Sequence, residues 1–478
     1  MLKVNCLKKN YFPSVFILLL SLGVLTGFYG CESSEIKDIT FFGGKIKNPK
    51  GKYIYLSKEN KVLDSAQLDD HNKFAFELDS IKEGLYVFNH GPEFQYLYLQ
   101  PTDSVLMYLN TWDFDESLIF SGKGSSKNNF LINLYLQQEK NEKNFKANYR
   151  LDEQKFSDLI DEGIQKQLDL YDIFVNDLDN PPSPQFEKLA KTGIYFPFYF
   201  MKEYYPYNHM WMMKSKEFPE LSDDFYAYRD QLNLNDPDLI DYEIYVVYVR
   251  TYLKHLAHKK KYIDPEDNNV ELHFMKEVNE KITVPRLKDR LLAGSAWSSL
   301  SNEHMSPEQH LAVQNFFFET CQNEEIKSEF KISLEQKSKL KSGQKLPDLI
   351  VVDSRGNEVK VNQVSQDNNT VIYFWPNDLM QIEIVNEKLD KLQKKYPDVK
   401  FIGIERTKEH KEWTAFLETK KLSADNQFKI SKDSECYSWF EGDMARSIIV
   451  NKDGNVLNSY LFFTDKYFDM HLADLKKR

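Results

Sequence analysis

The pattern of hydrophobic and polar residues changes twice along the chain, and each part predicts a different kind of domain. Between residues 38 and 125, short apolar runs are separated by turn sequences such as Asn48-Pro49-Lys50-Gly51 and Lys82-Glu83-Gly84. Several runs alternate apolar and polar residues, as half-buried antiparallel strands do. We therefore predict a β sandwich or barrel-like module whose strands include Thr40–Ile46, Tyr53–Leu56, Phe74–Leu78, Leu85–Phe88, Tyr96–Leu99 and Ser104–Leu109.

Residues 126–336 favour helices. Long segments mix charged and apolar residues at helical spacing, and loops such as 180–184 and 264–267 interrupt them. The predicted helices include Asn128–Asn144, Asp152–Asn176, Gln185–Tyr205, Leu239–His258 and Glu308–Gln322.

Residues 337–478 alternate strands and helices. The apolar run Val371–Trp375 leads into an amphipathic helix, and the strand Lys400–Ile404 and the helix His410–Leu422 follow. A hairpin at Ser447–Val456 and a terminal helix close the segment. The chain is thus expected to be an α+β multidomain protein with a β module, a helical middle and an α/β domain.

This last part resembles thioredoxin-like domains of the TlpA and peroxiredoxin type. The resemblance rests on Gly343–Asp348 and Asp353–Asn357, which match the entry hairpin, and on the β-α-β then β-β-α order. In active members, the resemblance implies a Cys-x-x-Cys pair after the first strand and a cis-proline before the closing strand. Those positions are Leu379, Ile382 and Ala445 here, so both halves of the redox centre are missing.

Two cysteines remain in the mature chain, Cys321 and Cys436, and they lie in different predicted domains. A catalytic thiolate needs cationic or helix N-terminal neighbours. Cys436 is instead flanked by Asp433 and Glu435, although Arg446 could compensate if the fold brings it close. The sequence favours two separate buried thiols and a protein that is not an enzyme, and a reactive Cys436 is the alternative.

The N-terminal segment is typical of an export signal. A lysine-rich start precedes the apolar run Val15–Leu25, which is too short to span a membrane. The Gly30-Cys31 that follows resembles a bacterial lipoprotein signal, which implies a lipid on Cys31, although Phe28 and Tyr29 depart from the usual pattern. An ordinary cleaved signal is the alternative. We assign residues 1–30 to the signal and 31–37 to a tether, and we expect an outer-membrane lipoprotein that faces the periplasm or the cell surface.

The β module at 38–125 resembles the domain of unknown function (DUF4369-like) that precedes thioredoxin-like domains in lipoproteins of the Bacteroidetes. Phe42–Asn48, Lys73–Phe76 and Leu99–Ser104 carry this resemblance, which implies no particular chemistry.

Composition and charge narrow the function further. The chain has 478 residues, enough for two or three domains, and a net charge of −11 argues against nucleic-acid binding. His255 and His258 share a predicted helix face, but no further ligand accompanies them, so we expect a solvated face, no metal site and no cofactor. The aromatic segment 195–213 fits either core packing, which we favour, or a binding groove.

These observations favour a binding or scaffold lipoprotein with a redox-inactive thioredoxin-like domain, a lipid anchor in the membrane and a protein partner in the envelope. Two alternatives stay open. One is a thiol-dependent oxidoreductase or peroxidase-like enzyme that acts through Cys436 or a partner's cysteines. The other is a lipoprotein that binds a ligand at the aromatic segment 195–213.

Overall fold

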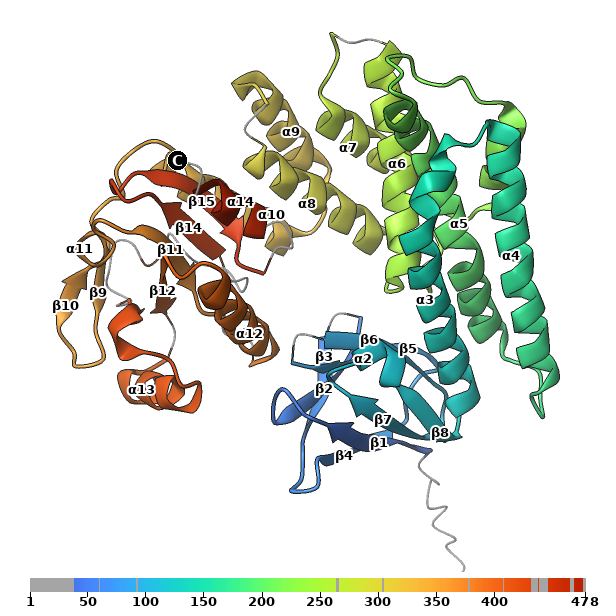
Figure 1. Ribbon diagram of the computed structural model, residues 1–478, viewed down its shortest axis with the longest axis horizontal. Helices are drawn as coiled ribbons and strands as arrows, with labels where there is room; N and C mark the ends of the chain where they lie inside the picture. The colour runs from blue at the N-terminus through green and yellow to red at the C-terminus, as the bar shows by residue number, and fades with distance from the viewer. Residues whose placement is uncertain are drawn as a thin grey trace, which may run out of the picture.

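The chain folds into a β unit, a helical unit and an α/β unit, which confirms the expected fold class (Figure 1). The computed structural model describes residues 38–59, 61–91, 93–263, 266–302, 305–376, 379–406, 408–430, 437, 446–464 and 468–475. Cys31, Cys436 and Ala445 lie outside these residues.

The β unit is a sandwich of two four-stranded sheets. One has the order β4-β1-β7-β8 and the other β3-β2-β5-β6. Strands β4 and β7 alternate buried and exposed positions along their length, and Phe42 and Phe76 stack in the core with ring centroids 6.0 Å apart. The bounds are β1 Ile39–Lys47, β2 Tyr53–Lys58, β3 Lys61–Gln67, β4 Lys73–Asp79, β5 Gly84–His90, β6 Glu93–Leu99, β7 Ser104–Asn110, the short helix α2 Phe114–Ser117 and β8 Ile119–Lys123.

Two features of this unit differ from the sequence expectation. Strands β1 and β7 run parallel, whereas the alternation suggested antiparallel pairs. Strand β3 was not predicted at all, because its positions are exposed or only half-buried and show no apolar alternation.

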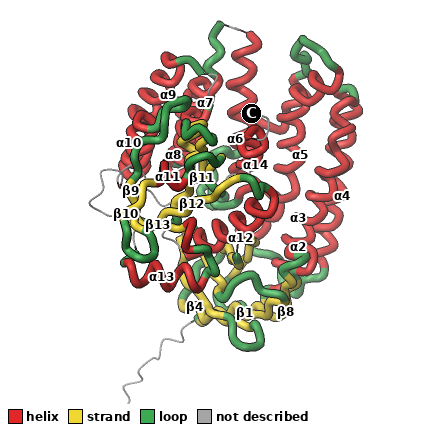
Figure 2. Tube along the Cα trace, turned by 60° about the vertical axis from the view of Figure 1, so that its left-hand side comes forward, coloured by secondary structure: helices red, strands yellow, loops and turns green. Residues whose placement is uncertain are grey.

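The helical unit follows directly. Its helices are α3 Ser125–Phe145, α4 Glu153–Asn176, α5 Pro184–Met213, α6 Glu243–Ile263, α7 Val270–Lys281, α8 Pro285–Ser301, α9 Pro307–Thr320 and α10 Glu324–Lys339, with 3-10 turns η1 Lys146–Arg150 and η2 Asp223–Gln231. Helices α3, α4 and α5 run side by side (Figures 1 and 2), and α5 also packs against α6. No helix among the described residues is long and apolar enough to cross a lipid bilayer.

Helix α5 is the centre of the helical unit. Ser183 caps its first turn through the amide of Phe186, and Pro184 occupies the first position, where its missing N–H costs nothing. The helix continues through Pro197 and Pro206 and ends at Met213, and the next residue, Lys214, is in the left-handed conformation at φ 54°. It therefore extends beyond the predicted end at Tyr205.

A buried carboxylate on α5 organises its contact with η2 and α6. Glu203 has no solvent exposure, and Arg229 binds it through two nitrogens, one of them Nε at 2.9 Å from Oε1. The hydroxyl of Tyr228 donates to Oε1 at 2.7 Å, and that of Tyr248 lies 3.4 Å from the same atom. The carboxylate is thus paired and hydrogen-bonded, as a buried charge requires.

The α/β unit contains a seven-stranded sheet with the order β10-β9-β13-β12-β11-β14-β15. Strand β11 runs parallel to β12 and antiparallel to β14, and α12 connects β11 to β12. The bounds are β9 Ile350–Val352, β10 Glu358–Lys360, α11 Val361–Val364, β11 Asn369–Phe374, α12 Leu379–Lys395, β12 Val399–Glu405, α13 His410–Thr419, η3 Ala424–Asn426, β13 Gln427–Lys429, β14 Arg446–Val450, β15 Val456–Phe462 and α14 Phe468–Leu475.

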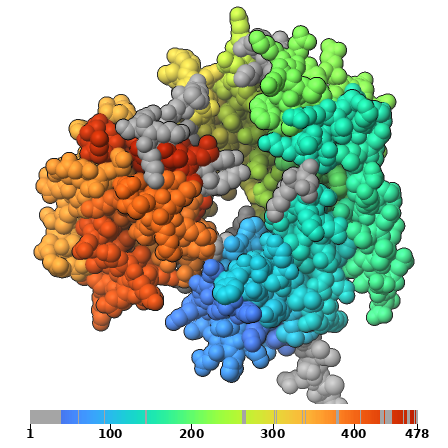
Figure 3. Space-filling model, in the orientation of Figure 1, coloured from blue at the N-terminus to red at the C-terminus, as the bar shows by residue number. Residues whose placement is uncertain are grey.

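The three units surround a central opening (Figure 3). Helix α12 is the part of the α/β unit that approaches the β unit, because Gly51 and Gly91 lie beside Glu383 and Glu387 of α12. On the other side, α8 packs against β15. The α/β unit therefore contacts both of the other units.

We expect Arg229→Met to lower the free energy of unfolding by about 3–5 kcal/mol, because it leaves the Glu203 carboxylate buried without a cation. The double variant Glu203→Gln/Arg229→Met should recover part of this loss, since no charge then remains buried. Arg286→Met removes a half-exposed arginine that pairs with Asp241 and should cost no more than about 1 kcal/mol. Urea unfolding measures all three. A double variant no more stable than Arg229→Met would contradict the argument.

Candidate functional site

The junction of β11 and α12 is the place where the sequence comparison put the redox cysteines. Trp375 follows β11 and is 1% exposed, and its Nε1 donates to Oε1 of Gln427 at 2.9 Å. Leu379 is the first residue of α12, and Ile382, also 1% exposed, packs in the same apolar cluster as Trp375 and Val385. The second cysteine position is thus occupied by a core side chain.

Cys321 is the free cysteine among the described residues. It caps the C-terminal end of α9 and is 2% exposed. Burial raises its pKa to about 11, so the sulfur is a thiol at neutral pH and not the thiolate that attacks disulfides. Cys321 therefore has the character of a structural residue.

The start of β14, which follows the Ala445 position, is held by the helical unit. Arg446 is 8% exposed, and its Nη2 donates to the Oγ of Ser333 in α10 at 2.7 Å. Ser333 is fully buried. The strand end that would border a redox centre is therefore part of an internal contact between two units.

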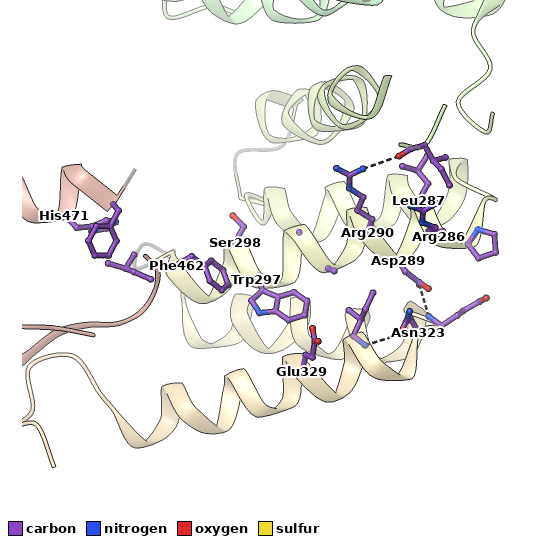
Figure 4. A pocket seen from close by; sticks show the side chains of 18 residues that line it. Arg286, Leu287, Asp289, Arg290, Trp297, Ser298, Asn323, Glu329, Phe462 and His471 are labelled. Atoms are coloured by element: carbon purple, nitrogen blue, oxygen red, sulfur yellow. Dashed lines mark hydrogen bonds between the residues drawn. The ribbon is translucent and has the colours of Figure 1, made fainter. Parts of the chain in front are cut away.

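A pocket of about 1270 Å³ lies beside this contact, between the helical and α/β units (Figure 4). Helices α8 and α10 form one side, and β15 and α14 contribute the other. Its lining includes Arg286, Asp289, Arg290, Trp297, Ser298, Asn323, Glu329, Phe462, Phe468 and His471. We call it the interdomain pocket.

The charged side chains of the interdomain pocket are held by partners in the protein. Arg290 donates through Nη2 to Glu243 at 2.7 Å and through Nη1 to the carbonyl of Ile240 at 3.2 Å. Arg286 pairs with Asp241 through two nitrogens, one of them at 3.0 Å. Such pairs fix the directions of the guanidinium groups, so the rim is rigid and polar.

The centre of the interdomain pocket is aromatic. The indole of Trp297 lies between Phe462 and the helix that carries Glu329 (Figure 4). Its ring packs edge-on against Phe330, with centroids 5.2 Å apart, and its Nε1 is shielded from solvent without a hydrogen-bond partner among the described residues. The interdomain pocket thus has an aromatic centre and a charged rim.

Sequence reasoning did not single out this pocket. Apart from Ile240, its lining comes from residues 285–329 and 461–471, and neither stretch carries a local motif. Only the pairing of two distant units brings Trp297 and Phe462 together.

The expectation of a solvated face for His255 was wrong. His255 is 3% exposed, and its Nδ1 lies 3.2 Å from the carbonyl of Glu203 and 3.5 Å from its carboxylate. Burial lowers the pKa of His255, and a lowered pKa favours the neutral form of the ring. The described residues contain no group of three or more His, Cys, Asp or Glu side chains that could hold a metal ion.

Some side chains of the aromatic segment 195–213 pack in the core, and others are exposed. Phe196, Phe198 and Tyr205 are buried in the core. Tyr204 and Trp211 are exposed, the latter by 67%.

Comparisons with known proteins concern the fold only. No family model and no curated protein matches the chain. A candidate thiol-disulfide oxidoreductase from Bacteroides vulgatus is 22% identical, over 29% of this chain and 99% of its own, with a TM-score of 0.26. The thioredoxin domain of a thiol-disulfide oxidoreductase from Bacteroides vulgatus is 19% identical, over 29% of this chain and 97% of its own, with a TM-score of 0.24.

A peroxiredoxin-like protein from Aquifex aeolicus is 18% identical, over 29% of this chain and 87% of its own, with a TM-score of 0.25. The α/β unit has a thioredoxin-like fold. This assignment rests on its strand order and on the crossover from β11 through α12 to β12.

We expect Cys321 to resist alkylation in the folded protein. In a Cys436→Ser background at pH 8, a pKa near 11 leaves roughly one thiol in a thousand ionised, against about one in four for an ordinary cysteine. Iodoacetamide should label Cys321 slowly in buffer and rapidly in urea, as peptide mass spectrometry reports. Equal rates before and after unfolding would contradict the assignment of a buried, protonated thiol.

Proposed function

We propose that the chain is a binding lipoprotein of the cell envelope, in which the thioredoxin-like unit holds a protein partner and does not exchange thiols. The observation that carries this proposal is the burial of Ile382 in the core of the unit, at the position where a redox enzyme needs its second cysteine. A side chain without sulfur there can neither resolve a mixed disulfide nor store two electrons.

The contact of Arg446 with Ser333 supports the same proposal. A thiol-exchange enzyme must present its redox centre to other proteins, whereas here the start of β14 is engaged by α10. The thioredoxin-like unit therefore acts as a wall of the interdomain pocket.

The interdomain pocket is where we place the partner. Its volume of about 1270 Å³ exceeds that of most small-molecule sites and suits a segment of a protein. Apolar or aromatic side chains of the partner would enter between Trp297, Phe462 and Phe468. The arginine and carboxylate rim would set the orientation of the segment.

A lipid on Cys31 would keep this pocket at a membrane surface. The polar tether 31–37 would hold the β unit off that surface, either in the periplasm or outside the cell. The proposed partner is accordingly another envelope protein.

A ligand-binding role of the aromatic segment is the second candidate. Phe196, Pro197 and Phe200 line a separate pocket of about 430 Å³. A thiol-dependent enzyme that acts through Cys436 or a partner's cysteines is the competing hypothesis, and activity measurements separate it from a binding role.

We expect the purified chain from residue 32 onward to reduce insulin disulfides no faster than background, because Leu379 and Ile382 replace the cysteine pair. A thioredoxin with an intact pair serves as the positive control. Turnover by this protein that disappears in Cys436→Ser would contradict the proposal and support the thiol-enzyme hypothesis.

We expect Gly294→Trp to abolish partner capture. Gly294 is an exposed residue of α8 that lines the interdomain pocket, and a Cβ there meets no atom within 4 Å, so a large side chain has room to project from the helix beside the pocket. Crosslinking in intact cells, followed by purification of the tagged chain, should yield a partner with the native protein that Gly294→Trp loses.

Gly294→Ala is the matched control, because it changes the same position without filling the pocket. It should retain the crosslinked partner and raise stability by up to about 1 kcal/mol, since alanine favours a helix over glycine. Identical crosslinked products from the native protein and both variants would place the partner elsewhere.

A further inference from the structure

The pocket of about 430 Å³ lies where strand β6 meets helices α3, α5 and α6. Strand β6 is at the edge of its sheet, and α3 packs against it (Figure 1). The volume suits a small organic ligand. This pocket shares no lining residue with the interdomain pocket, so an occupant here would be independent of the proposed partner.

All charged side chains that line this pocket are acidic. They are Glu93, Asp115, Glu139 and Glu243, and no lysine, arginine or histidine joins them among the described residues. Glu243 is already paired with Arg290 at 2.7 Å. The charged groups of the lining itself are therefore acidic, and Glu93 and Asp115 face each other across it without a lining cation among the described residues.

Glu93 and Asp115 are the carboxylates on which the argument depends. Burial raises the pKa of Asp115, and the neighbouring charges that act on it, Glu116 and Glu139, are also negative. Partial burial raises the pKa of Glu93 as well, with further contributions from Glu387 and Asp115, whereas Lys391 and Lys50 act in the opposite direction. The side chain of Asp115 accepts a hydrogen bond from Nε2 of Gln95 at 2.9 Å, which fixes its position. A cation between these carboxylates would relieve their repulsion.

Aromatic rings form the walls beside the carboxylates. Tyr96 lies edge-on to Tyr242, with centroids 5.4 Å apart, and its hydroxyl accepts a hydrogen bond from the amide of Glu243 at 2.9 Å. Phe196 and Phe200 complete the apolar side. Aromatic faces attract cations through their quadrupole, so rings and carboxylates together favour an organic cation over a neutral or anionic ligand.

We propose that this pocket binds a small organic cation that carries an apolar or aromatic group. The cationic centre lies near Glu93 and Asp115, and the apolar group packs against Phe196 and Phe200. Neither the thioredoxin-like fold nor the proposed partner binding requires such a site.

The test is calorimetric titration of the full chain with benzyltrimethylammonium, and with benzenesulfonate as an anion that has the same ring. The cation should bind and the anion should not. Asp115→Asn, which keeps the shape and can still accept from Gln95, should weaken cation binding about tenfold, a loss of about 1.4 kcal/mol.

Glu116→Gln is the matched control. It removes the same charge from the next residue of α2, whose side chain does not line the pocket, and should change the affinity less than about twofold. Glu93→Gln, at an exposed position, provides a second test that does not depend on the folding of Asp115→Asn. Absence of cation binding by the native chain, equal binding of the anion, or equal losses in Asp115→Asn and Glu116→Gln would each overturn the proposal.

Discussion

The buried ion pair between Glu203 and Arg229 is the interaction on which the helical unit depends. A carboxylate without solvent exposure is tolerated only where cations and donors surround it, and here they come from η2 and α6. This requirement fixes α6 against α5, and α6 in turn packs against α7 and α7 against α8. Helix α8, which is joined to α5 through this series of contacts, forms a wall of the interdomain pocket.

In the thioredoxin-like unit, apolar side chains pack together where β11 leads into α12. Ile382 and Trp375 belong to one apolar cluster, and Arg446 is engaged by Ser333 across the boundary with the helical unit. The burial of Ile382 stabilises the unit through the hydrophobic effect. An isoleucine carries no sulfur, so the side chain that packs the core at this position cannot resolve a mixed disulfide.

The sequence predicted the helices and strands that have strong periodicity. It did not predict the features that depend on contacts between distant parts of the chain. The alternation in β4 and the apolar stripe with Ile382 and Leu389 identified their elements, since burial repeats at the period of the backbone. Strand β3 has no buried stripe. The parallel pairing of β1 with β7 depends on tertiary packing, which the local pattern of residues does not show. The burial of His255 was not predicted because its partner, Glu203, lies on another helix, and no pattern near His255 indicates that contact. The interdomain pocket could not be predicted, since it joins segments far apart in the chain; of the smaller pocket, the sequence indicated only the part that the aromatic segment 195–213 contributes.

The ion pair between Glu243 and Arg290 joins a residue that lines one pocket to a residue that lines the other. Glu243 lines the carboxylate-rich pocket, and Arg290 lines the interdomain pocket. Their contact at 2.7 Å neutralises both, so neither group adds net charge to its own pocket while the pair is intact. The carboxylates on which the smaller pocket then depends are those on β6 and α2, and the polar lining of the larger pocket includes guanidinium groups that are already bound. The smaller pocket can thus be acidic while the interdomain pocket contains charges of both signs, although a residue of one lining pairs with a residue of the other.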